Sequence, residues 1–161
     1  MMSKKLTHFD ENGRPSMVDV SAKPIMLRTA RARGDFVAKK ETIDAILIGD
    51  LPKGEALTVA RIAGIQAAKQ CDSIIPLCHT IPLEYVQVDF DRKGDTRLVI
   101  NTKVIAKGRT GIEMEALTAV NAAALALWDM TKAIDANLLI DNIHLCEKIK
   151  EPISLEPSLQ K

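Results

Sequence analysis

The chain has 161 residues, of which 47% are hydrophobic and only 3% aromatic, enough for a single domain with a core of Ala, Val, Ile and Leu. Because 22 Lys and Arg residues nearly balance 21 Asp and Glu residues, the general basic surface of a nucleic-acid-binding protein is excluded. An anionic small molecule would therefore have to be bound by locally placed cations.

The first forty residues are predicted to form an arm followed by short strands. Residues 1–16 are polar and rich in turn formers, so we expect an N-terminal arm. Residues 17–21 (MVDVS) are a strand-like run. A further strand is expected within residues 27–40, around the run at residues 35–38.

Two helices are predicted next. Residues 41–48 carry apolar side chains at helical spacing, and Gly49 is placed to end that helix. The second helix covers residues 55–70 and is apolar almost all round. A helix of this composition is expected to be buried.

The middle of the chain predicts a β-hairpin. Prolines bracket residues 74–82, which excludes a helix there. Residues 85–90 and 97–106 read as strands, and the polar turn at residues 91–96 contains a glycine. This arrangement favours an antiparallel hairpin.

The last third predicts one long helix and one strand. The helix covers residues 112–134, is rich in Ala and Leu, and would be about 35 Å long. Residues 138–148 alternate as a strand, and residues 151–161 read as a C-terminal tail. Mixed strands and helices with an antiparallel hairpin indicate an α+β fold in one domain, spanning residues 17–150.

The cysteines and the hydropathy pattern limit the kind of protein further. Cys71, Cys78 and Cys146 lack the spacing of a four-ligand zinc site, so we expect reduced thiols and no metal. No apolar run approaches the roughly 18 residues of a membrane span, and the first residues lack a signal-peptide core. We expect a cytoplasmic protein.

Two polar residues lie where the backbone turns. Lys53 lies between Pro52 and Gly54 before a helix, where free N–H groups and a lysine could bind a phosphate; a solvated loop lysine is the simpler alternative. His79 follows Pro-Leu-Cys in a turn. It could donate a hydrogen bond to a phosphate or a ring carbonyl, or merely to a loop carbonyl.

The long helix carries acidic residues in its first turn. Glu113 and Glu115 could hold the amine and ring N–H of a guanine-like base. Acidic residues are also ordinary partners of a helix dipole at this position, and the sequence leaves both readings open.

Asp129 and Lys132 form the sharpest pair near the other end of that helix. Their spacing of three places them on one face. Because Trp128 and Met130 flank the aspartate, we expect the pair to border packed surface, where burial would shift both pKa values. Such a pair can transfer protons; the alternative is a surface ion pair.

Helix geometry separates these two groups of polar residues. Glu115 and Asp129 are fourteen positions apart, or about 21 Å along a straight helix. If both serve one site, it is expected to be shared between subunits. Mixing inactive Lys53 and Asp129 variants would then restore some activity.

Four segments containing these residues resemble one family in order and spacing. They are MVDVSAKP, KGEALTVARIAGIQAAKQ, IIPLCHTIPL and KGRTGIEMEALTAVNAAALALWDMTKAID. They closely resemble the molybdenum cofactor biosynthesis protein C family, the cyclic pyranopterin monophosphate synthases. The resemblance covers roughly residues 6–149.

The resemblance implies a ferredoxin-like α+β fold and a homohexamer, a trimer of dimers, with active sites at subunit interfaces. It implies a lyase that converts 3′,8-cyclo-7,8-dihydroguanosine triphosphate, made by a separate radical enzyme, to cyclic pyranopterin monophosphate and pyrophosphate. No metal or organic cofactor is required by these residues, and magnesium could accompany the triphosphate.

The resemblance also implies residue roles. Asp129, Lys53 and Lys132 match the family's catalytic positions. The substrate-binding segments match Leu77, Cys78, His79, Met114 and Glu115, and supporting polar positions match Arg28 and Glu113.

Two other functions fit the composition. One is a non-catalytic oligomer that binds a guanine nucleotide. The other is an RNA-binding module of similar fold, but only Tyr85 and Phe90 are aromatic in strand-like runs, and no basic stripe accompanies them.

Overall fold

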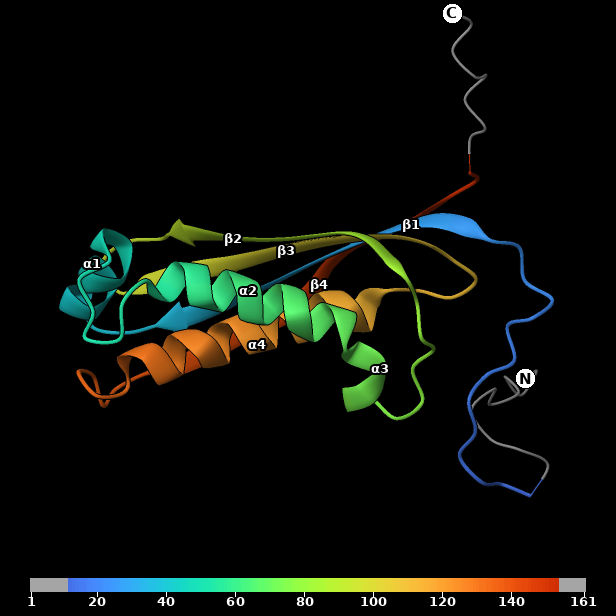
Figure 1. Ribbon diagram of the computed structural model, residues 1–161, viewed down its shortest axis with the longest axis horizontal. Coiled ribbons are helices and arrows are strands. Elements are labelled where there is room, and N and C mark those ends of the chain that lie inside the picture. Colours follow the sequence, from blue (N-terminus) through green and yellow to red (C-terminus); the bar gives the residue numbers. More distant parts are fainter. Residues whose placement is uncertain (1–11, 154–161) are drawn as a thin grey trace, which may run out of the picture.

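A computed structural model describes residues 12–153. The strands form one antiparallel sheet, and helices pack along one side of it (Figure 1). The elements in chain order are β1 (Met26–Val37), α1 (Lys40–Ile48), α2 (Ala56–Lys69), α3 (Cys71–Ile74), β2 (Leu83–Arg92), β3 (Arg97–Gly108), α4 (Glu113–Thr131) and β4 (Leu139–Glu151). The predicted α+β class is confirmed.

The four strands are ordered β2-β3-β1-β4, and all neighbouring pairs are antiparallel. The predicted hairpin is confirmed as β2 and β3. With the helices inserted after β1 and after β3, this order is that of a ferredoxin-like fold. The strands β2 and β4 form the two edges of the sheet.

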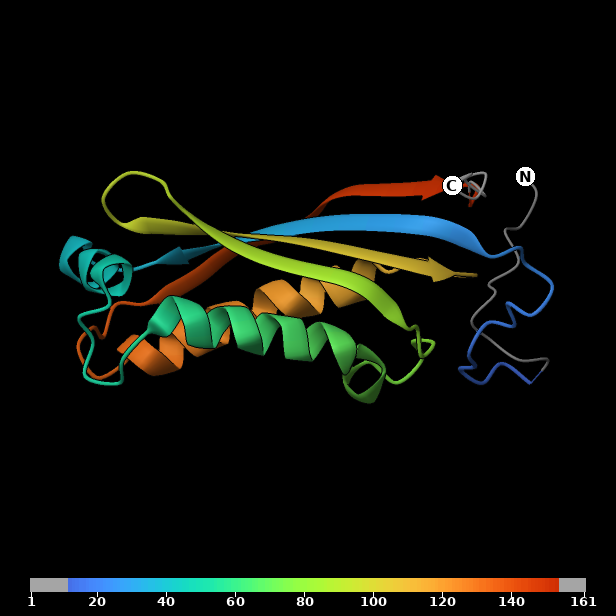
Figure 2. The same ribbon diagram turned by 45° about the horizontal axis from the view of Figure 1, so that its top comes forward.

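The helices α2 and α4 lie side by side against one face of the sheet (Figure 2). They pack closely because small residues face each other: a Cβ atom at Gly64 would lie 2.9 Å from the carbonyl oxygen of Ala119. The expectation that α2 is buried on all sides is wrong. Val59 and Ile62 are 43% and 58% exposed, and the buried residues of α2 are the small ones Ala56, Ala60, Gly64 and Ala68.

The remaining elements follow the prediction, except that β1 begins earlier than expected, α3 was not predicted and residues 17–21 form no strand. The helix α1 ends at Gly49, whose φ of 75° is accessible to glycine at little cost. The helix α4 is shorter than expected, and β4 continues to Glu151. Residues 17–21 form no strand: the Ser21 N–H donates to Asp19 Oδ1 at 2.8 Å, which turns the chain instead.

The predicted domain boundaries stay predictions. Most of the proposed arm and tail, residues 1–11 and 154–161, lies outside the described residues. No helix among residues 12–153 is long and apolar enough to cross a membrane.

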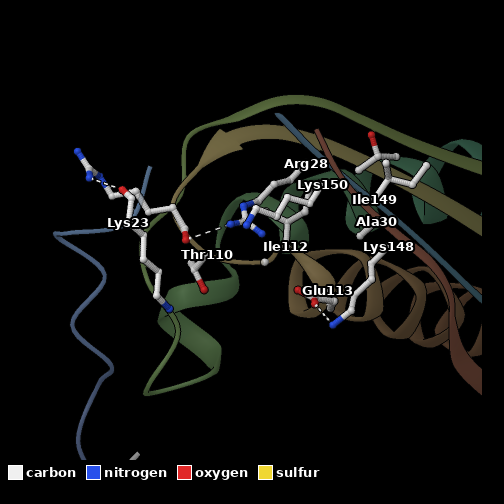
Figure 3. Close-up of a pocket in the computed structure, with 12 residues that line it drawn as sticks. Lys23, Arg28, Ala30, Thr110, Ile112, Glu113, Lys148, Ile149 and Lys150 are labelled. Carbon is white, nitrogen blue, oxygen red and sulfur yellow. Dashed lines mark hydrogen bonds and ion pairs between the residues drawn. The ribbon is translucent and has the colours of Figure 1, made fainter. Parts of the chain in front are cut away.

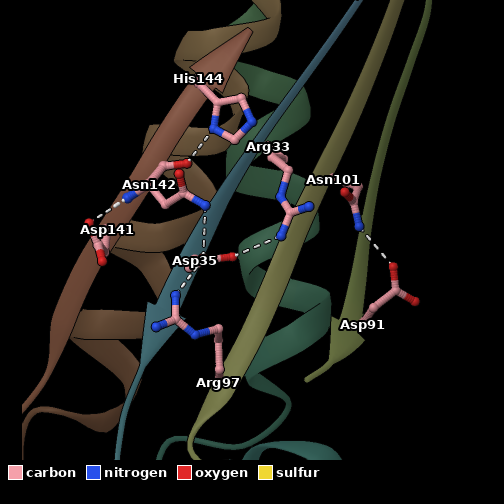
Figure 4. Close-up of polar contacts among 8 residues, drawn as sticks. All are labelled: Arg33, Asp35, Asp91, Arg97, Asn101, Asp141, Asn142 and His144. Atoms are coloured by element: carbon pink, nitrogen blue, oxygen red, sulfur yellow. Dashed lines mark hydrogen bonds and ion pairs between the residues drawn. The ribbon is translucent and has the colours of Figure 1, made fainter. Parts of the chain in front are cut away.

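A buried carboxylate joins β1, β3 and β4 on the face of the sheet opposite the helices (Figure 4). Asp35 is 3% exposed and accepts hydrogen bonds from Arg97, from Arg33 at 3.5 Å and from Asn142 at 3.2 Å. Asn142 adopts a φ of 53° where the pairing of β1 with β4 is irregular. Burial opposes ionisation of Asp35, but hydrogen bonds from Asn142 and Arg97 outweigh it and lower its pKa below 3.8.

Asp35→Asn should lower the free energy of unfolding near neutral pH by about 1–3 kcal/mol, because two arginines lose a charged acceptor. A lowered pKa stabilises the fold above the pKa of the unfolded chain, and this contribution is lost as the pH falls through the folded-state pKa. The difference between wild type and variant should therefore shrink below about pH 4. Urea unfolding between pH 7 and pH 3 measures it, and a difference independent of pH would contradict the assignment.

Candidate active site

Three predicted residues meet at the C-terminal end of α4, and we call them the lysine–aspartate cluster. Lys53 Nζ donates to Asp129 Oδ2 and to the Asp129 carbonyl oxygen, both at 2.8 Å. Lys132 Nζ lies 2.7 Å from Asp129 Oδ1. Lys53 reaches this position from the loop that connects α1 to α2, so two residues 76 positions apart in sequence form one ion pair.

The lysine–aspartate cluster faces solvent. The side chains of Asp129 and Lys132 are each 57% exposed, so the expected burial of this pair is wrong. The reason is that Asp129 points outward from α4, whereas its neighbour Met130 is buried in the core. Hydrogen bonds from Lys132 and then Lys53 lower the pKa of Asp129 to about 2, so the carboxylate is ionised at neutral pH.

The predicted binding segments meet at the opposite end of α4, in a cavity of about 490 Å³. We call it the α4 N-terminal pocket. Among its lining residues are six that the sequence singled out: Leu77, Cys78, His79, Glu113, Met114 and Glu115. The turn after α3 supplies the first three and the first turn of α4 supplies the others. Sequence segments more than thirty positions apart thus form one wall.

Three groups in this pocket have defined protonation preferences. His79 Nε2 lies 2.8 Å from the carbonyl oxygen of Val18, and because a carbonyl only accepts, Nε2 carries the proton. Glu115 is buried, and burial, followed by the charges of Glu113 and Asp72, raises its pKa. The neighbouring Cys78 thiol also has a raised pKa, chiefly because of burial.

A second cavity of about 450 Å³ adjoins this pocket and contains Arg28 (Figure 3). Arg28 donates from Nε to the Gly108 carbonyl at 3.0 Å and from Nη2 to the Arg109 carbonyl at 3.1 Å. It therefore orders the loop that leads into α4. The two cavities share Lys23, Thr110, Gly111, Glu113 and Lys148 among their lining residues.

Sequence reasoning missed the cations around these cavities. Lys23, Arg109, Lys148 and Lys150 all line the cavity of Arg28. Lys148 and Lys150 alternate in β4 opposite Ala30 and Arg28, and Lys148 lies 3.1 Å from Glu113. Their alternation in sequence was a signal, but only the pairing of β4 with β1 places them beside α4.

The candidate residues therefore form two groups at opposite ends of one helix. Figure 1 shows the loop containing Lys53 at one end of α4 and the segment after α3 at the other. Glu115 and Asp129 are separated by fourteen positions of α4, or about 21 Å. Lys53 and Asp129, in contrast, belong to the same group within one chain, so this geometry does not support the rescue expected between variants of these two residues.

The described residues include no group of three or more His, Cys, Asp and Glu side chains that could hold a metal ion.

Comparison with known proteins identifies close relatives. The sequence model described as "MoaC family" matches residues 17–150. A cyclic pyranopterin monophosphate synthase from Limosilactobacillus fermentum is 46% identical over 147 residues, covering 91% of this chain and 89% of that protein. The cyclic pyranopterin monophosphate synthase from Thermomicrobium roseum is 50% identical, covering 89% of this chain and 87% of that protein. Cyclic pyranopterin monophosphate synthase 3 from Mycobacterium tuberculosis is 50% identical, covering 89% and 81%.

Proposed function

Because the chain belongs to the MoaC family, we infer that it converts 3′,8-cyclo-7,8-dihydroguanosine triphosphate to cyclic pyranopterin monophosphate and pyrophosphate. It is a lyase of molybdenum cofactor biosynthesis. The observation that carries this inference is the family match over residues 17–150, which includes every candidate residue. Relatives named as synthases disfavour the non-catalytic nucleotide-binding alternative.

The lysine–aspartate cluster is the proposed catalytic group. Ring opening and closure require proton transfers, for which Asp129 and Lys132 serve as base and acid. With both lysines bonded to it, Asp129 has a pKa of about 2 and is a weak base. The substrate phosphates attract the lysines. When one lysine turns from Asp129 to a phosphate, the pKa of Asp129 rises and the carboxylate becomes a stronger base. Substrate binding thereby activates its own base.

The α4 N-terminal pocket is the proposed site of the purine-derived ring. Leu77 and Met114 expose apolar surface to the ring face, while His79 and the carboxylates of Glu113 and Glu115 supply polar partners for its edge. Cys78 lies on the same wall.

The cations beside that pocket suit the phosphates. Lys23, Arg109, Lys148 and Lys150 provide positive charge around the cavity of Arg28. Together with the catalytic lysines they neutralise the charge that develops on leaving pyrophosphate.

A complete site is proposed to combine the two ends of α4 from neighbouring subunits of a homohexamer, a trimer of dimers. The separation of about 21 Å between Glu115 and Asp129 supports a shared site. Exposed apolar side chains on the outer face of the helix layer, at Val59, Ile62 and Leu125, support burial against another subunit.

The proposal needs no resident metal or organic cofactor, because side chains of this protein can carry the proton transfers and neutralise the phosphates. Magnesium can accompany the triphosphate substrate. We place the protein in the cytoplasm, downstream of a radical enzyme that makes the cyclised nucleotide.

Incubating the purified protein with the cyclised triphosphate tests the function. We expect stoichiometric release of pyrophosphate and formation of cyclic pyranopterin monophosphate, measured by coupled phosphate detection and mass spectrometry. Tight binding without pyrophosphate release would instead support the nucleotide-binding alternative. Guanosine triphosphate, which lacks the extra ring, serves as the control and should release none.

A further inference from the structure

A buried carboxylate, Asp135, joins the end of α4, which carries Asp129, to α1, which precedes the loop of Lys53. Asp135 lies just after α4 and is 2% exposed. Its Oδ2 accepts hydrogen bonds from the Lys39 backbone N–H at 2.8 Å and from the Thr42 hydroxyl at 3.0 Å. Its Oδ1 accepts the Asn137 N–H at 2.8 Å. Lys39 has no side-chain cap bond of its own, so Asp135 supplies the acceptor for the start of α1.

Asp135 is also held firmly to the end of α4. Its own N–H donates to the Thr131 carbonyl at 3.2 Å, and the buried Thr131 hydroxyl donates to the Leu127 carbonyl at 2.7 Å. Lys132 lies within this turn. The position of α1 is therefore set relative to the same helical turn that carries the catalytic pair.

The other end of α1 leads directly to Lys53. Only four residues separate Ile48, the last residue of α1, from Lys53. The short segment is fixed by a bond from the Asp50 N–H to the Ala45 carbonyl at 3.0 Å and by the buried Leu51 side chain. A rotation or slide of α1 would therefore move Lys53 with it.

These contacts form a closed circuit from α4 through Asp135, α1 and Lys53 back to Asp129 on α4. We propose that Asp135 is a positioning residue that holds Lys53 against Asp129, and so sets the geometry of the catalytic cluster from behind. The proposal rests on the proposed function for its catalytic meaning, but its structural content does not depend on turnover. Asp135 itself does not touch the cluster's reacting groups; it acts through α1.

Asp135→Asn tests this proposal with the full-length protein. The Asp129 carboxyl signal, followed by carbon-13 NMR at about pH 3.5, reports how well Lys53 holds it. In the wild type this carboxyl should be almost fully ionised, since its pKa is about 2. In Asp135→Asn its protonated fraction should rise by the same amount as in Lys53→Ala, with Lys132 still holding the pKa of Asp129 below its usual value. In the double variant the second substitution should add nothing.

The matched control is Asp35→Asn. Asp35 is likewise buried and accepts three hydrogen bonds, but these come from Arg33, Arg97 and Asn142, which all lie in the sheet. This variant should lose stability yet leave the Asp129 signal unchanged. Thr42→Val, which removes one bond to Asp135, should shift the signal in the same direction as Asp135→Asn by a smaller amount, and it provides a second test if Asp135→Asn does not fold.

Steady-state kinetics tests the effect of Asp135 on the proposed reaction. We expect Asp135→Asn to lower kcat roughly 10- to 100-fold with little change in KM, because a small misplacement of Lys53 affects the reacting groups and not the α4 N-terminal pocket. An unchanged Asp129 signal in Asp135→Asn, or in Thr42→Val if the former does not fold, would overturn the proposal, as would an equal shift in Asp35→Asn. Absence of turnover in the wild type would refute the proposed function alone, since the NMR result stands apart from it.

Discussion

Lys132→Ala should lower kcat by about 10³-fold or more while leaving the protein folded. Lys132 makes the contact that lowers the pKa of Asp129 most, and it is a proposed acid and phosphate partner. Its side chain is 57% exposed, so its removal creates no cavity and should change the free energy of unfolding by only about 0.5 kcal/mol. Pyrophosphate release and a urea unfolding curve on the same preparation measure the two effects.

Lys40→Ala is the matched control for this result. Lys40 is 52% exposed and pairs with Asp44 at 2.5 Å on α1, so it resembles Lys132 in exposure and in having an aspartate partner. It lies outside both cavities and the lysine–aspartate cluster. Its loss should leave kcat within a factor of about two. Near-normal turnover of Lys132→Ala would remove this residue from the mechanism.

Co-expression of Lys132→Ala with His79→Ala should restore about a quarter of wild-type activity, although each variant alone is inactive. In a shared site, one subunit supplies the lysine–aspartate cluster and its neighbour supplies the α4 N-terminal pocket. With equal amounts and random assembly, about one site in four receives an intact group from each subunit. Two affinity tags isolate the mixed oligomers, and turnover per site measures the rescue.

The structure also dictates which pair must fail. Lys53 and Lys132 both contact Asp129 within one chain, so Lys53→Ala and Lys132→Ala damage the same half of the site. Mixing these two variants should give no rescue. Recovery in this pair, or none in the pair of Lys132→Ala and His79→Ala, would contradict a site shared in this way.

Local patterns in the sequence were enough for most of the fold. Apolar spacing located α1, α2 and α4, and the glycine-bearing polar turn located the β2–β3 hairpin. The failures came where tertiary contacts decide. Residues 17–21 alternate like a strand but have no partner strand, and hydrophobicity alone could not show that only the small residues of α2 are buried.

In the candidate site, too, local spacing could be predicted from the sequence, whereas long-range contacts could not. Spacing within α4 correctly separated Glu115 from Asp129, because helix rise is a local property. The hydrogen bonds of Lys53 with Asp129 and of Asp135 with Thr42 join residues more than seventy positions apart. Likewise, the ion pair of Lys148 with Glu113 depends on the register between β4 and β1. No local pattern encodes such contacts.

The uninterrupted course of α4 makes its length as important as its composition. A single residue inserted between Glu115 and Asp129 would swing the aspartate by about 100° around the axis and push it about 1.5 Å further along. Point changes on the outer face leave this alignment intact, whereas any insertion or deletion destroys it. If both ends of α4 contribute to the proposed site, the number of residues in this helix is constrained, whereas the length of the loops is not.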